Sequence, residues 1–154
     1  MSNDIVISND NENNDDFYRI LRQKIEKWLS SEEGENYRWA RYISIAPDLL
    51  HLLCKLVIHK DVSNQDKAKL GAALVYFISP IDLIPEGAVG PIGYIDDIAF
   101  AAHVLNHVIK NNSEIVVQQW AGDENILKLV KDILEVADEM LGSGLWEKIK
   151  GMLN

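Results

Sequence analysis

The sequence predicts an all-α protein, and three observations support this prediction. Its 154 residues are 47% hydrophobic and 25% charged, which suits one globular domain with a buried core. Apolar residues recur at spacings of three, four and seven, the period of an amphipathic helix. No strand-like alternation of useful length occurs after residue 16. We expect a compact single-domain bundle of about seven helices over residues 15–154, with a Pro/Gly-rich apolar turn between two core helices.

The first residues differ from the rest of the chain in charge. Residues 1–16 hold five acids, five asparagines and neither Lys nor Arg, so they carry −5 of the net charge of −9. Such a segment buries too little apolar surface to offset the entropy lost on ordering. We therefore expect residues 1–14 to be a disordered acidic tail.

Composition also limits location and partners. The N-terminal residues lack the basic start and apolar run of a secretory signal, and the single cysteine, Cys54, cannot form an internal disulfide. We expect a cytoplasmic protein, or one peripheral to the membrane. Nucleic-acid binding requires clustered Lys and Arg, and the basic residues here form no run, so we expect no nucleic acid as a partner.

The N-terminal half shows three helical patterns. The first begins near Asp15, where Asp15 or Asp16 can act as the cap, and places one face at Phe17, Ile20, Leu21, Ile25, Trp28 and Leu29. Gly34 breaks this pattern, and a second helix should end near Pro47, because proline disfavours helix in the preceding residue. Pro47 itself suits the first turn of a third, leucine-rich helix through Val57. We expect that third helix to be central.

The fourth pattern is the run Leu70–Ile78, preceded by Ser63 and Asp66 at capping-box spacing. The run is apolar all round, but it is far shorter than the roughly 20 residues of a membrane span. We expect it to be the buried centre of the fold and to end at Ser79-Pro80. Its small residues, Gly71, Ala72 and Ala73, should let another helix approach closely.

The C-terminal half continues with amphipathic stripes. One runs from Ile95 to Ile109 and ends at Asn111-Asn112-Ser113, where a shorter helix starts. Another ends at Gly142, a typical residue after a helix C-terminus. A last short helix carries Trp146 and Ile149.

The segment from Ser79 to Gly93 holds three of the four prolines and three of the nine glycines, and Asp96 and Asp97 follow it closely. It is too apolar for a solvated loop, so proline and glycine should fix its backbone across the core. We expect Asp82 to approach Asp96 and Asp97 where the two flanking helices meet. The candidate turn residues are Ser79, Pro80, Asp82, Pro85, Glu86, Gly93, Asp96 and Asp97.

The block SPIDLIP at residues 79–85, followed by GYIDD at 93–97, resembles the bacterial YkvA-type domain of unknown function. The resemblance covers a YkvA-like core at residues 64–110. It implies a helical fold and a site without an established activity, and some family members are predicted to be membrane-associated. Glu86-Gly87-Ala88-Val89-Gly90-Pro91 stands where the commonest family pattern has an acid and a bulky apolar pair.

The acids of this segment allow a metal hypothesis. Hard divalent cations take oxygen ligands, and Asp96 shares a helix face with His103 and His107, a histidine pair at i and i+4 that can chelate a transition metal. The structural alternative is that Asp82 caps the turn, while Asp96 and Asp97 in a first helical turn each complement the helix dipole by roughly 0.3–1 kcal/mol. No cofactor is predicted, although a divalent metal is compatible with these residues.

Two functional hypotheses remain open. The favoured one is a non-enzymatic module that binds an unknown protein partner or a membrane surface through the SPIDLIP turn or the Trp146 helix. The alternative is a metal-dependent enzyme or metal sensor built on Asp82, Asp96, Asp97 and His103. A hydrolase is disfavoured, because Cys54 lies in a leucine-rich stretch that is typical of packing.

Overall fold

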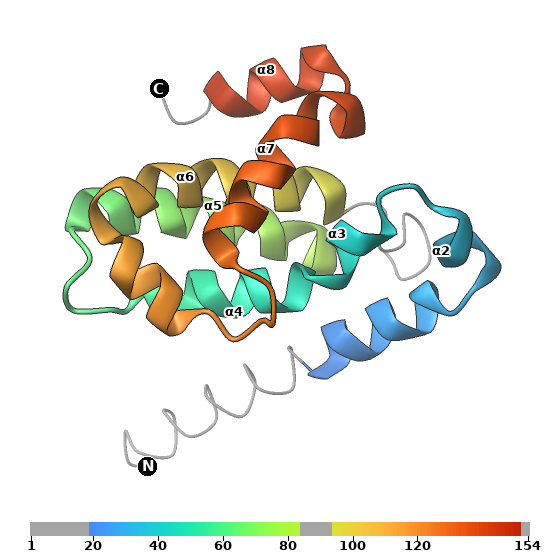
Figure 1. Ribbon diagram of the computed structural model, residues 1–154, viewed down its shortest axis with the longest axis horizontal. Coiled ribbons are helices and arrows are strands. Elements are labelled where there is room, and N and C mark those ends of the chain that lie inside the picture. Colours follow the sequence, from blue (N-terminus) through green and yellow to red (C-terminus); the bar gives the residue numbers. More distant parts are fainter. Residues whose placement is uncertain (1–18, 84–93, 152–154) are drawn as a thin grey trace.

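Helix α6 (Tyr94–Gln119) is the element around which the other helices pack. The computed structural model describes residues 19–83 and 94–151, without the side chains of residues 78–83 and 143. The partners of α6 are α3 (Ala40–Ser44), α4 (Ala46–Val57), α5 (Asn64–Leu83), α7 (Ile126–Leu141) and α8 (Ser143–Gly151). Figure 1 shows α4, α5 and α6 running side by side, with α7 crossing them steeply. The described residues contain no strand, so the all-α prediction is confirmed.

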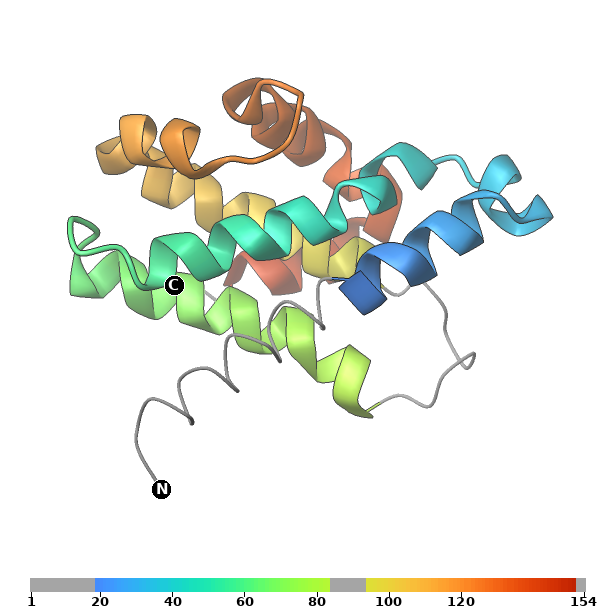
Figure 2. The same cartoon turned by 90° about the horizontal axis from the view of Figure 1, so that it is seen from below.

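The N-terminal helices are short, and each buries only a few residues. A helix over residues 19–29 buries Leu21 and Ile25 on the predicted face, and Figure 2 shows it beside the start of α4. In α2 (Glu32–Asn36), the Ser31 hydroxyl accepts a hydrogen bond from the Gly34 N–H at 3.1 Å. Gly34 thus lies inside a helix, and the prediction that it breaks one is wrong. A Cβ at Gly34 would overlap the Trp28 carbonyl oxygen, so glycine permits the close approach of these segments.

Helix α4 begins as the sequence predicts. Pro47 lies in its first turn, where the missing N–H would have no partner in the helix. The helix buries residues on most of its circumference, namely Ala46, Pro47, Leu49, Leu50, Leu52, Leu53 and Leu56. The tail expected over residues 1–14 and the cap expected at Asp15 lie outside the described residues.

Helix α5 is longer than predicted. Its backbone remains helical from Asn64 to Leu83, so the prediction that it ends at Ser79-Pro80 is wrong, and Asp82 lies within the helix. An interior proline loses one helical hydrogen bond and disfavours the helix by about 3 kcal/mol. Its ring nevertheless holds φ near about −65°, a helical value, so the helix can continue past it.

The same helix is also less buried than predicted. Leu70, Ala73 and Phe77 are buried, whereas Ala72 is exposed and Val75 is 67% exposed. Helix α5 therefore buries one face and is not the centre of the fold. That place belongs to α6, whose Ala99, Ala101 and Ala102 are fully buried and are small enough for close packing by several neighbours. No helix in residues 19–83 or 94–151 combines the length and apolarity needed to cross a bilayer.

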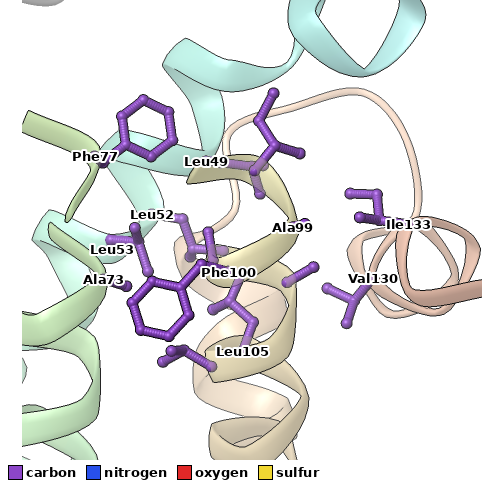
Figure 3. Packing of buried hydrophobic residues seen from close by; sticks show 14 of the residues in the cluster. Leu49, Leu52, Leu53, Ala73, Phe77, Ala99, Phe100, Leu105, Val130 and Ile133 are labelled. Carbon is purple, nitrogen blue, oxygen red and sulfur yellow. The ribbon is translucent and has the colours of Figure 1, made fainter. Parts of the chain in front are cut away.

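Phe100 of α6 fills the space between three helices. Figure 3 shows its ring beside Leu52 and Leu53 of α4 and Ala73 of α5. On the other side of α6, Ala99 points toward Val130 and Ile133 of α7. The core is therefore continuous from α5 through α6 to α7.

A buried polar contact joins the start of α5 to a kink in α6. The Asn112 amide donates to the Asp66 carboxylate at 2.9 Å and to the Val108 carbonyl at 3.0 Å. Asn112 has non-helical backbone angles, φ −138° and ψ 31°, so the predicted break at residues 111–113 is confirmed as a kink. The predicted cap is also present, because the Ser63 hydroxyl accepts a hydrogen bond from the Asp66 N–H at 3.1 Å.

We expect Asn112→Ala to lower the free energy of unfolding by about 0.5–1.5 kcal/mol, the net contribution of a typical hydrogen bond. The change removes the amide donor from the buried Asp66 carboxylate. Urea unfolding measures the effect, with Asn111→Ala at the exposed neighbouring position as the control. Equal stability of the two variants would show that the contact contributes nothing.

Candidate functional site

The C-terminal part of α5 and the first turn of α6 meet at one end of the bundle. The Phe77 ring stacks on Tyr94, with ring centroids 5.8 Å apart and planes at 20°. Tyr76 packs edge-on against Phe100, with centroids 5.2 Å apart. The two helices that flank the Pro/Gly-rich segment therefore come together as the sequence predicts.

Asp97 is the most unusual residue at this end. It is 2% exposed, and neither carboxylate oxygen has a hydrogen-bond partner among the described residues. Burial, followed by the charge of Asp96, raises the pKa of Asp97 to about 9. A buried ionised carboxylate without a partner is costly, so the fold favours the protonated form of this group.

Asp96 and three tyrosines interact electrostatically with each other or with Asp97 at this end of the bundle. Asp96 is partly exposed, and burial raises its pKa above the ordinary value. Burial and then the charge of Asp97 raise the pKa of Tyr94 to about 12. Burial and then both acids raise the pKa of Tyr76, and burial and then Asp96 raise that of Tyr37. We call these five residues, Tyr37, Tyr76, Tyr94, Asp96 and Asp97, the acidic–aromatic cluster.

Among the described residues, the acids of the cluster have no basic partner in an ion pair. The ion pairs of the described residues lie elsewhere, such as Arg22 with Asp48 at 3.0 Å and Arg41 with Glu124 at 2.7 Å. None of them involves Asp96 or Asp97. The three tyrosines are only partly buried, so the cluster reaches the protein surface.

The predicted histidine pair belongs to a different contact, between α6 and α8. The rings of His103 and His107 lie 4.9 Å apart, and His103 packs edge-on against Trp146 at 5.8 Å. Burial and then His107 lower the pKa of His103, whose Nε2 has no partner in the described part of the chain. Trp146 is only 6% exposed. This ring packs inside the fold, and the hypothesis that its helix binds a partner stays a prediction.

These positions bear on the metal hypothesis. Among the described residues, no group of three or more His, Cys, Asp and Glu side chains is arranged to hold a metal ion. Asp96 and Asp97 face tyrosines, whereas His103 and His107 face α8 and the start of α5. Side chains of Ser79, Pro80 and Asp82 are not described, and Pro85, Glu86 and Gly93 lie outside the described residues.

Sequence reasoning missed the tyrosines of the cluster. Tyr94 precedes Asp96 by two positions and Tyr76 lies on the predicted flanking helix, so a search for aromatic residues near the acids would have found both. Tyr37 comes from the connection between α2 and α3. Only the tertiary fold brings it near Asp96.

Comparison with known proteins agrees with the family resemblance. Residues 66–102 match the family described as "Protein of unknown function (DUF1232)". The chain is 29% identical over 119 residues to "Uncharacterized protein ORF9" of Methanothermobacter thermautotrophicus, covering 77% of this chain and 80% of that protein. It is 36% identical over 50 residues to "E3 ubiquitin-protein ligase RNF170" of Danio rerio, covering 32% of this chain and 19% of that protein.

No solved structure matches the chain. The matched segment 66–102 includes four residues of the cluster, namely Tyr76, Tyr94, Asp96 and Asp97. The acidic pair and two of its neighbouring tyrosines thus lie within the segment that is similar to this family.

Proposed function

We propose that the protein is a non-enzymatic interaction module that binds a protein partner at the acidic–aromatic cluster, near the C-terminal end of α5 that carries the first residues of the SPIDLIP block. The observation that carries the proposal is the buried Asp97 carboxyl, which has no hydrogen-bond partner among the described residues. An unsatisfied buried polar group costs roughly 1–3 kcal/mol. Such costs are typical of functional sites, where stability is lost in favour of binding.

Charge favours a protein over a membrane surface as the partner. The chain has a formal net charge of −9, and Asp96 of the cluster forms no ion pair with a described residue. Anionic membrane surfaces attract basic segments and repel acidic ones. A cytoplasmic location is part of the same proposal.

The enzymatic alternatives have less support. The ligase named among the relatives matches this chain over only 19% of its own length, so we carry no activity over from it. The metal-dependent alternative lacks a three-residue ligand group in the described part of the chain. A divalent metal is retained only as an outcome to be tested.

The test is affinity capture from the source cells with the immobilised full chain, followed by binding measurements with each purified candidate. We expect a protein that binds the wild type and binds Asp96→Asn at least about tenfold more weakly, since a hydrogen bond to a charged group contributes about 1.5–3 kcal/mol. Asp123→Asn is the control, because it removes the same charge at an exposed position between α6 and α7.

Two results would overturn the proposal. One is that every captured protein binds the wild type and Asp96→Asn equally. The other is that the chain binds vesicles containing phosphatidylserine and no protein in a manner that depends on Asp96, which would make the membrane surface the partner.

A further inference from the structure

One face of the last helix packs on a histidine of α6. Helix α8 contacts α6 and α7, and it buries Trp146 and Ile149, which are 6% and 1% exposed. The Trp146 ring lies edge-on to His103, with ring centroids 5.8 Å apart. The His107 ring is also edge-on to His103, at 4.9 Å. The docking of α8 therefore includes a contact with a side chain that can change its charge near neutral pH.

This contact suits a neutral His103 better than a charged one. The His103 Nε2 atom is buried and has no hydrogen-bond partner among the described residues. A protonated imidazole carries an N–H at both nitrogens, so protonation adds a buried donor without an acceptor. An aromatic ring attracts a nearby cation, but the Lys150 ammonium already lies 5.5 Å from the centre of the Trp146 ring.

The electrostatic surroundings of His103 also favour its neutral form. Burial, and then the neighbouring His107, lower the pKa of His103. A hydrogen bond with the Lys150 backbone raises this pKa, and the charge of Lys150 lowers it again. Within the described part of the chain, no acid contributes to this pKa.

The other charged groups near the histidine pair do not compensate a charge on His103. On α8, the Glu147 carboxylate pairs with the Lys150 ammonium at 2.8 Å. Burial and then two lysines lower the pKa of His107, and one acid raises it, namely Lys110, Lys69 and Asp66. Among the described residues, no charged group of α3, α4 or α7 contributes to the pKa of either histidine.

We propose that α8 is a pH-sensitive switch, in which protonation of His103 releases Trp146 from α6 and lets α8 turn away about Gly142. Gly142 connects α7 to α8 and has φ 85°, a backbone conformation that glycine adopts without strain. Release exposes Trp146 and Ile149. The switch lies apart from the acidic–aromatic cluster and does not rest on the proposed function.

The direction of the pH dependence follows from proton linkage. A histidine in a released, solvated helix contact has a pKa of about 6.5, whereas the docked contact disfavours the charged form. The released state therefore binds more protons than the docked state. Docking should weaken as pH falls from 7 to 5.

The experiment is hydrogen exchange of the full chain, in which the opening constant of the α8 backbone N–H groups is corrected for the intrinsic effect of pH. From pH 7 to pH 5 we expect this constant to rise by at least about threefold. One histidine with a free pKa of about 6.5 limits the rise to about 25-fold.

Two variants test the role of His103. His103→Phe keeps an aromatic ring that cannot be protonated, so it should remove most of the rise. His59→Asn is the control, because His59 lies in the connection between α4 and α5. Its Nδ1 accepts a hydrogen bond from the Asp61 N–H, and an asparagine oxygen can accept one in its place. This variant should show the same rise as the wild type.

A measurement on the wild type decides the matter even if His103→Phe does not fold. The ring signals of His103, followed by NMR against pH, should titrate with a midpoint below about 6.5. A midpoint at or above this value would overturn the inference, and so would an α8 opening constant that stays flat from pH 7 to pH 5. An equal rise for the N–H groups of α4 would also overturn it, since the whole fold would then open and α8 would not be released on its own.

Discussion

Phe100→Ala should lower the free energy of unfolding by about 3–5 kcal/mol, the usual cost of truncating a buried phenylalanine. Phe100 is 1% exposed and lies where α4, α5 and α6 meet (Figure 3). Its edge contact with Tyr76 at 5.2 Å is of a kind that adds about 0.5–1.5 kcal/mol. Urea unfolding followed by circular dichroism measures the change.

Leu74→Ala is the control for this prediction. Leu74 lies on the core helix that the sequence predicts to be buried, yet it is only partly buried. Its truncation should cost less than half as much as that of Phe100, because less apolar surface is exposed and a smaller cavity remains. If the two changes cost the same, α5 is buried on both faces and the arrangement around α6 is wrong.

Much of the fold follows from local sequence patterns. Pro47 at a helix start and the kink at Asn112 are set by backbone geometry that single residues reveal. Gly142 ends α7 with φ 85°, a value that favours glycine. Such signals act within one or two turns, so they need no knowledge of the tertiary structure.

The incorrect predictions concern burial and helix length, which depend on residues that are distant in the sequence but close in the fold. Ala72 and Val75 are apolar but exposed, because a folded protein cannot cover all of its apolar surface. Pro80 lies within α5, although proline usually ends a helix.

The sequence predicted only part of the candidate site, because the rest depends on contacts between helices. The sequence singles out Asp96 and Asp97, since they follow a Pro/Gly-rich apolar segment, and the structure brings them beside Tyr76 across α5 and α6. Helical spacing also joined Asp96 with His103. In the fold, however, the His103 ring packs against Trp146 of α8, a contact that no spacing within α6 could reveal.

Asp97→Asn should stabilise the protein, by an amount that grows with pH. Burial raises the pKa of Asp97 in the folded protein to about 9, whereas an aspartate in an unfolded chain has a pKa of about 3.9. Between these values the folded state binds the extra proton, so the stability of the wild type that comes from this group falls as pH rises. Asparagine cannot ionise, and it removes that loss.

Thermal unfolding from pH 5 to pH 9 tests this prediction. Near pH 8, Asp97→Asn should be more stable than the wild type by about 1–3 kcal/mol, because one pH unit of this proton linkage is worth about 1.4 kcal/mol. The difference should narrow toward pH 5, and the Asp123→Asn control should show no such trend.

Divalent cations decide between the remaining explanations of this acid. If Asp97→Asn is less stable than the wild type at every pH and Mg²⁺, Mn²⁺ and Zn²⁺ have no effect, Asp97 stabilises the first turns of α6 through the helix dipole and is not a binding residue. If these cations stabilise the wild type and not the variant, the acids hold a metal. If the variant gains stability and the cations have no effect on either protein, the carboxyl is kept at the expense of stability for a different function.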